Sequence, residues 1–147
     1  MGARLLILAA RIAAGVIMLR SGLEKLRSGW IANQGLERFI AHSDQAFGFF
    51  RGFLTHTVAS HIKLFSYLVV MGELGVGVCL ILGFLTRWAS FVGLLMMIFF
   101  ALSEGVLLQP ASPVLMGIVF LLLSSINAGM IAGVDRWLRG RAPDWVV

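Results

Sequence analysis

The chain contains few charged residues, cysteines or prolines, and each shortage narrows the class of protein it can belong to. Charged residues make up 13% of the 147 residues, against roughly 25% in a soluble globular domain. The single cysteine, Cys79, excludes an internal disulfide and a Cys-x-x-Cys redox pair. Two of the three prolines, Pro110 and Pro113, stand close together and favour a loop. These shortages leave long uninterrupted apolar helices as the main building element.

Apolar residues make up 59% of the chain and gather in long runs. A bilayer core requires ~20 mostly apolar residues per helix. We therefore expect transmembrane helices at about residues 5–23, 62–83, 88–105 and 114–134. The pattern predicts an all-α membrane protein with one domain over residues 1–147, folded as an antiparallel four-transmembrane-helix bundle. The partner that this composition demands is a lipid bilayer.

The connection between the first two apolar runs has an amphipathic pattern over about residues 33–60. Four apolar residues recur there at helical spacing: Phe47, Phe50, Leu54 and Val58. Ser43 or Asp44 is suited to cap such a helix. We expect short amphipathic helices on the membrane surface that form a lid over one end of the bundle. The alternative is an interfacial anchor without a binding role.

The net charge of +5 reflects basic residues that are scattered around apolar runs. This scatter argues against nucleic acid, which needs basic residues clustered on one solvated face. Arg4, Arg87 and the basic tail from Arg136 fall on one side of the predicted topology, and the Gln109 loop opposite has no Lys or Arg. The positive-inside rule then places both termini in the cytoplasm. The expected location is a bacterial or archaeal plasma (inner) membrane.

Glu73 is the first candidate for function, because acids inside membrane segments are rare and usually face a partner or a wet cavity. With Leu23, Ile62 and Val114 taken as outer helix ends, three polar residues lie ~16 to 20 Å deep at 1.5 Å per residue. These residues are Arg11, Glu73 and Asn127. We predict an ion pair between Arg11 and Glu73 near the midplane, with Asn127 as a candidate third member.

A second polar layer is expected at the outer mouth of the bundle, beneath the lid. Its candidate ligand-binding residues are Arg20, Glu24 and Glu104. Arg20 and Glu24 are four residues apart on one helix face, which suits a local ion pair.

Two interpretations of the midplane charges stay open. The pair could be purely structural, because a buried charge specifies its partner and thereby the helix register. Alternatively Glu73 and Arg11 could be catalytic, binding a quinone headgroup or relaying its protons. Quinone is therefore a possible ligand, although no cofactor motif is visible.

Metal binding is not expected from this sequence. His56 and His61 are five residues apart, on different faces of a helix, and no cysteine or acid completes a zinc set. Neither the three histidines nor Cys79 receives a role.

The assembled motifs resemble the DoxX family, in particular its DoxD-like branch, and the resemblance covers nearly the whole chain. The motif residues are Arg11, Gly15, Gly22 and Lys25, the run from Gly72 and Glu73 to Arg87, and the run from Asn127 to Leu138. The resemblance implies a four-helix membrane subunit. In that branch the small subunit of thiosulfate:quinone oxidoreductase takes part in passing electrons from thiosulfate to quinone, with a second subunit and with tetrathionate as product.

Three functions remain open on this basis, and the sequence does not decide whether the chain is an enzyme. The first is a quinone-linked oxidoreductase subunit. The second is a non-catalytic accessory or assembly subunit that binds other membrane subunits or further copies of this chain. The third is a carrier or channel for small solutes, which the lack of an internal repeat disfavours.

Overall fold

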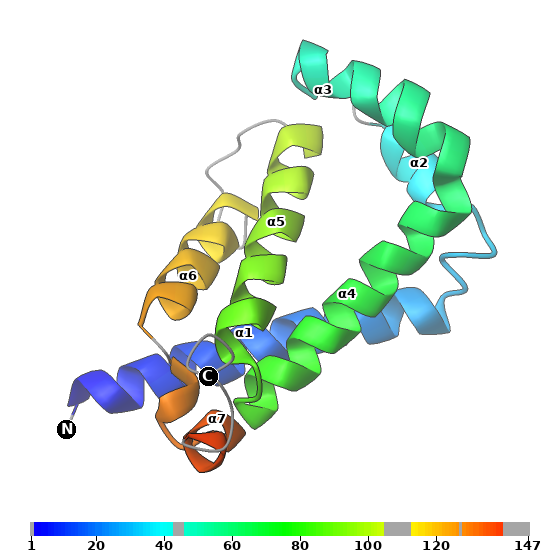
Figure 1. Ribbon diagram of the computed structural model, residues 1–147. Helices are drawn as coiled ribbons and strands as arrows, with labels where there is room; N and C mark the ends of the chain where they lie inside the picture. Colours follow the sequence, from blue (N-terminus) through cyan, green and yellow to red (C-terminus); the bar gives the residue numbers. More distant parts are fainter. Residues whose placement is uncertain (1, 43–45, 105–112, 127, 140–147) are drawn as a thin grey trace.

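The computed structural model describes residues 2–42, 46–104, 113–126 and 128–139, and over these the chain folds into helices joined by turns (Figure 1). The Glu104 side chain is outside this description. The α-helices are α1 (Gly2–Arg27), α2 (Gly35–Ala41), α3 (Gly48–Phe53), α4 (Ile62–Leu82), α5 (Thr86–Glu104), α6 (Pro113–Ser125) and α7 (Val134–Leu138).

Three helical segments are long and apolar enough to cross a membrane, namely Gly2–Arg27, Gly48–Leu82 and Thr86–Ser103. The expected all-helical membrane class is thereby confirmed. The predicted end of the second run is also confirmed, because Gly83 adopts a left-handed conformation with φ +66° just after α4. The amide N–H of Gly83 bonds the Leu80 carbonyl, and that of Phe84 bonds the Cys79 carbonyl. This is the Schellman arrangement that ends helices at glycine.

The predicted continuous helix over residues 114–134 is wrong. The helix α6 has only 13 residues and ends at Ser125. The side chains of Ser124 and Ser125 both donate to the Leu121 carbonyl oxygen, and such local bonds compete with helix continuation. A 3-10 turn at Ala128–Met130 and the short α7 follow.

Small residues bring α1 and α4 into close contact. A Cβ atom at Gly15 would lie 3.0 Å from the Gly77 carbonyl oxygen, and one at Gly22 would lie 3.1 Å from the Leu74 backbone nitrogen. A Cβ atom at Gly77 would lie 2.6 Å from the Leu19 nitrogen. Since later residues of α1 meet earlier residues of α4, these two helices are antiparallel, and their register follows from the glycines.

The amphipathic segment forms short helices, as predicted. Between α3 and α4 the chain passes through a π-helix at Leu54–Val58 and a 3-10 turn at Ala59–His61, and Figure 1 shows the curved path that results. Leu36, Leu54 and Val58 are fully buried. We call residues 30–61 the lid. The predicted cap residues Ser43 and Asp44 lie outside the described residues.

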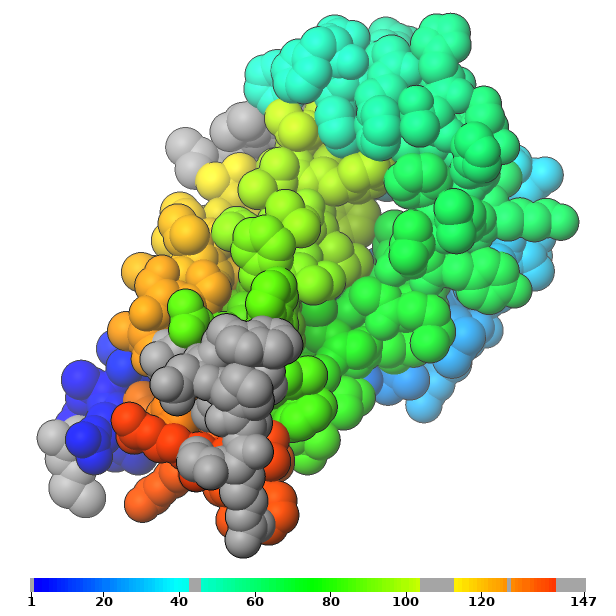
Figure 2. Space-filling model, in the orientation of Figure 1, coloured from blue at the N-terminus to red at the C-terminus, as the bar shows by residue number. Residues whose placement is uncertain are grey.

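The end of the molecule opposite the lid holds the first residues of α1 together with α7. Figure 2 shows α7 beside the first part of α1, and Arg4, Arg136 and Arg139 line one surface pocket there. Three of the basic residues that the sequence predicts on one side of the topology therefore lie together, whereas Arg87 lines a different pocket.

Candidate functional site

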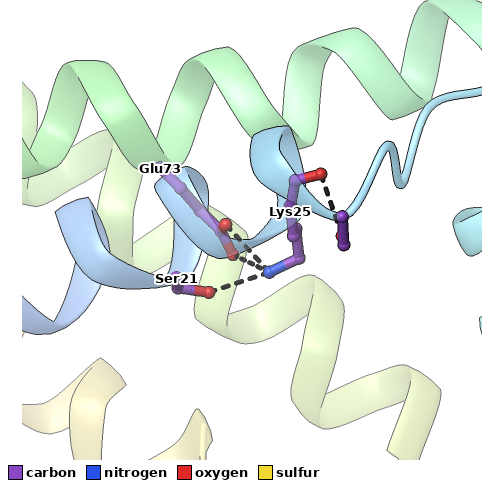
Figure 3. Close-up of polar contacts among 4 residues, drawn as sticks. Ser21, Lys25 and Glu73 are labelled. Carbon is purple, nitrogen blue, oxygen red and sulfur yellow. Dashed lines mark hydrogen bonds and ion pairs between the residues drawn. The ribbon is translucent and has the colours of Figure 1, made fainter.

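Glu73 pairs with Lys25. The Lys25 ammonium lies 2.7 Å and 2.8 Å from the two carboxylate oxygens of Glu73, and it also donates to the Ser21 hydroxyl at 2.8 Å. Figure 3 shows the Lys25 nitrogen between the Ser21 hydroxyl, also from the last turns of α1, and the Glu73 carboxylate on α4. The three N–H groups of the ammonium thus have three partners.

The pair is partly buried, and two aromatic rings lie near its ammonium group. The Glu73 side chain is 3% exposed, whereas that of Lys25 is 22% exposed. The Lys25 nitrogen lies 5.9 Å from the ring centroid of Trp30 and 6.0 Å from that of Phe100. Both distances are within the range of cation–π attraction. The lysine therefore forms the accessible side of the pair and the carboxylate the enclosed side.

A pocket of about 530 Å³ lies beside Lys25, between the end of α1, the lid and the first turns of α4. Its polar and aromatic lining includes Lys25, Trp30, Glu37, Lys63, Ser66 and Tyr67. Typical sites for small molecules have volumes of about 300–1,000 Å³ and combine apolar walls with a few polar groups. The pocket therefore has room for a single-ring ligand.

The predicted ion pair between Arg11 and Glu73 is wrong, because the helices are staggered. Flush ends would place Gly22 level with residue 63, but it lies beside Leu74, about eleven residues or ~16 Å further along α4. Arg11 consequently meets Gly83, with its guanidinium nitrogen 2.7 Å from the position of a Cβ there. Glu73 lies ~15 Å from that level at 1.5 Å per residue.

Arg11 instead binds the backbone that follows α6. Its guanidinium donates to the carbonyl oxygens of Ala128 at 2.9 Å, Ile131 at 3.0 Å and Ala132 at 3.2 Å. The side chain is 1% exposed. A non-helical segment inside an apolar protein needs partners for its carbonyls, and Arg11 supplies them, so the contacts of this residue indicate a structural role.

Asp135 provides a partner for backbone N–H groups at the start of α5, as Arg11 does for backbone carbonyls after α6. Its carboxylate accepts the backbone N–H groups of Leu85 at 2.7 Å and Thr86 at 2.9 Å. The first N–H groups of a helix have no partner within it, and an anion there is favourable. Asp135 is 3% exposed, so α7 is anchored against the turn between α4 and α5.

The remaining predicted site residues separate into two groups. Arg20 and Glu24 form the expected ion pair at 2.7 Å, but their side chains are 79% and 63% exposed, so the pair is not beneath the lid. The Glu104 side chain and all of Asn127 lie outside the described residues. Within those residues, no group of three or more His, Cys, Asp or Glu side chains could hold a metal ion.

The sequence did contain a signal for Lys25. The residues of α1 that face α4 follow at intervals of three or four: Arg11, Gly15, Met18, Gly22 and Lys25. Extending this stripe by one turn past the assumed helix end at Leu23 reaches Lys25. Asp135 had no comparable signal, because its position depends on where the chain bends after Ser125.

Chemically, the pair of Lys25 and Glu73 offers one cationic donor and one enclosed carboxylate within 3 Å of each other. Such a pair can donate a hydrogen bond to a carbonyl oxygen and can hold or pass on a proton. Lys25 borders the pocket, and Glu73 lies directly behind it.

Comparison with known proteins agrees with this architecture. Residues 6–106 match the DoxX family. No curated protein and no solved structure matches the chain. The matched region contains both members of the Lys25–Glu73 pair, the lid and the turn at Gly83. The chain belongs to the DoxX family of membrane proteins.

Proposed function

We propose that this protein is a quinone-binding membrane subunit of an oxidoreductase, of the DoxD-like type that uses thiosulfate as electron donor. The supporting observation is the pocket of about 530 Å³ beside the pair of Lys25 and Glu73. A quinone headgroup is a flat ring with two carbonyl oxygens. It calls for an aromatic or apolar wall and a hydrogen-bond donor, which Trp30 and Lys25 provide.

A quinone takes up two electrons and two protons when it becomes a quinol. The residues of this chain would supply the binding and the proton path. The Lys25 ammonium exchanges its bond to Ser21 for a bond to the headgroup oxygen, while it stays paired with Glu73. In quinone reduction Lys25 would deliver one proton to that oxygen and regain one by way of Glu73, while water at the open side of the pocket would deliver the second proton to the other oxygen. The electrons come from a partner subunit that oxidises two thiosulfate ions to one tetrathionate.

We also propose how the helices are arranged in the membrane. In it α1, α4, α5 and α6 form an antiparallel bundle of four crossings, and α6 reaches the far surface through the segment that Arg11 supports. Both termini are cytoplasmic, and the lid lies at the outer surface of a bacterial or archaeal plasma membrane. The pocket then opens at the depth of the lipid headgroups, where a quinone enters from the bilayer.

The second candidate is an accessory subunit without chemistry. It is favoured by one observation, that all three N–H groups of the Lys25 ammonium already have partners inside the chain. In that role the pair fixes the register of α1 and α4 and binds no ligand.

Quinone content distinguishes these candidates. The full chain is purified from its native membrane in mild detergent, and extracted quinone is quantified per chain. We expect about one quinone per chain, and a loss of most of it in Lys25→Met. Arg27→Gln, an exposed basic residue at the same helix end, is the matched control and should retain quinone.

The double variant Lys25→Met/Glu73→Met removes the pair without leaving an unpaired charge. We expect it to fold and to lack quinone. Quinone retained in the double variant would contradict the proposal. A stable large partner purified without quinone, and membranes without thiosulfate-dependent quinone reduction, would favour the accessory function.

A further inference from the structure

Three arginines surround a second pocket, at the end of the molecule opposite the lid. The pocket has a volume of about 740 Å³. Arg4 comes from the first turn of α1, and Arg136 and Arg139 come from α7 and the residue after it. Figure 2 shows the two segments side by side on the surface.

The positive charge of this pocket has no counterpart in the described part of the chain. None of the three arginines forms an ion pair there. The acid nearest in sequence, Asp135, is buried and its carboxylate accepts the N–H groups of Leu85 and Thr86. Three guanidinium groups around one hollow repel one another, so an anion bound between them would be stabilised.

The rest of the pocket wall is apolar. It is formed by Leu5, Leu8, Met130, Ile131 and Ala132. Leu5 is 61% exposed, and it belongs to the apolar helix α1, which is long enough to cross a bilayer. A soluble anion would leave this wall unused, whereas an amphiphile with an anionic head would contact both parts.

We propose that this basic pocket binds the phosphodiester headgroup of an anionic phospholipid, with one acyl chain along Leu5 and Leu8. Guanidinium groups bind phosphate oxygens with paired hydrogen bonds, and basic pockets between helices at the membrane surface suit anionic headgroups. The wall includes Ile131 and Ala132, whose carbonyls Arg11 holds. The lipid therefore also braces the non-helical segment between α6 and α7.

The test is a titration of phosphatidylglycerol into the full chain in phosphatidylcholine–detergent micelles, with bound lipid counted by native mass spectrometry. We expect one saturable phosphatidylglycerol per chain. The double variant Arg136→Gln/Arg139→Gln should bind it about 25-fold more weakly, at about fivefold per arginine.

Two further variants show whether the arginines bind the lipid through their charge and whether that charge must lie in this pocket. Arg27→Gln/Arg38→Gln removes the same charge at the lid end and should bind as the unmodified chain does. Arg136→Lys/Arg139→Lys keeps the charge but not the paired hydrogen bonds, so it should bind more tightly than Arg136→Gln/Arg139→Gln and more weakly than the unmodified chain. An unfolding midpoint of Arg136→Gln/Arg139→Gln equal to that of the unmodified chain, measured without phosphatidylglycerol, excludes a folding defect as the cause. Equal binding by the unmodified chain and the Arg136→Gln/Arg139→Gln variant would overturn the proposal.

Inorganic phosphate distinguishes a pocket that binds a lipid headgroup from one that binds a free anion. In phosphatidylcholine micelles we expect phosphate at millimolar concentration to leave the thermal unfolding midpoint unchanged, while phosphatidylglycerol raises it. If phosphate alone raised the midpoint, and this rise were absent in Arg136→Gln/Arg139→Gln, the pocket would be a soluble-anion site and the lipid assignment would be overturned.

Discussion

A carboxylate buried among apolar helices requires a compensating charge, and Lys25 provides it for Glu73 through two contacts below 3 Å. The lysine reaches inward along its own apolar stem from the last turns of α1. Its charge thus stays near the pocket while that of Glu73 is enclosed. This asymmetry is what a donor in contact with a ligand and a proton-holding group behind it would need.

The stability of single and double variants tests whether Lys25 and Glu73 stabilise the fold as a pair. Glu73→Met or Lys25→Met alone leaves one charge unpaired, which should lower the free energy of unfolding by about 3 kcal/mol. The double variant should lose less than either single variant, because it buries two apolar side chains of similar size. The measurement is the unfolding midpoint in detergent. If the loss in the double variant equalled the sum of the two single losses, the two residues would not interact.

Arg11 illustrates the opposite use of a buried charge. Its partners are three backbone carbonyls and not a carboxylate. A guanidinium has five N–H donors in a fixed plane, so it can serve several carbonyls of an irregular segment at once. The residue therefore makes the interruption after α6 tolerable in an apolar environment.

Glycines bring the backbones of α1 and α4 close together. At Gly77 a Cβ atom would meet the backbone of Leu19, which cannot move as a side chain can. At Gly75, two residues away, a Cβ atom would have no neighbour within 4 Å. The two glycines lie on the same helix but only one faces α1.

These two glycines form a matched pair of variants. Gly77→Ala should separate α1 from α4 and destabilise the protein by about 1–3 kcal/mol, as overpacking does. Gly75→Ala should be neutral or stabilising by up to about 1 kcal/mol, because alanine favours helix over glycine. Thermal unfolding in detergent gives both values. Similar midpoints for the two variants would contradict the register described here.

The lid is held by apolar and aromatic side chains, whereas α1 and α4 meet through glycines. The lid residues Leu36, Leu54 and Val58 are fully buried, and the ring of Phe50 contacts that of Phe99 on α5 at a centroid distance of 5.4 Å. Leu54 and Val58 are the first and last residues of the π-helix between α3 and α4. The lid is therefore packed onto the end of α5 and not merely tethered to α4.

For the whole molecule, the two ends differ in chemistry. One end has the lid, the aromatic rings and the pocket beside Lys25, and the other has the arginines of α1 and α7. Since basic residues favour the cytoplasmic side of short loops, we expect the arginine end in the cytoplasm and the lid outside.

Labelling of single cysteines tests this orientation. In a Cys79→Ala background, Ala41→Cys on the lid should react with a membrane-impermeant maleimide in intact cells. Gly2→Cys, at the arginine end, should react only after the membrane is opened. The reverse result would invert the orientation, and equal labelling of both sites in intact cells would contradict a crossing by α1.

The sequence by itself determined the elements of this protein up to the end of α5. Apolar runs of sufficient length, the glycine stop at Gly83 and the helical spacing of Leu54 and Val58 are local properties, because each helix satisfies its own backbone hydrogen bonds. The family was also readable from the sequence. The tertiary structure decided which charges meet. That outcome depends on the stagger of α1 against α4, which backbone contacts at Gly15, Gly22 and Gly77 determine, and on the bend after Ser125. Neither is a property of any one segment, so Lys25 and not Arg11 became the partner of Glu73.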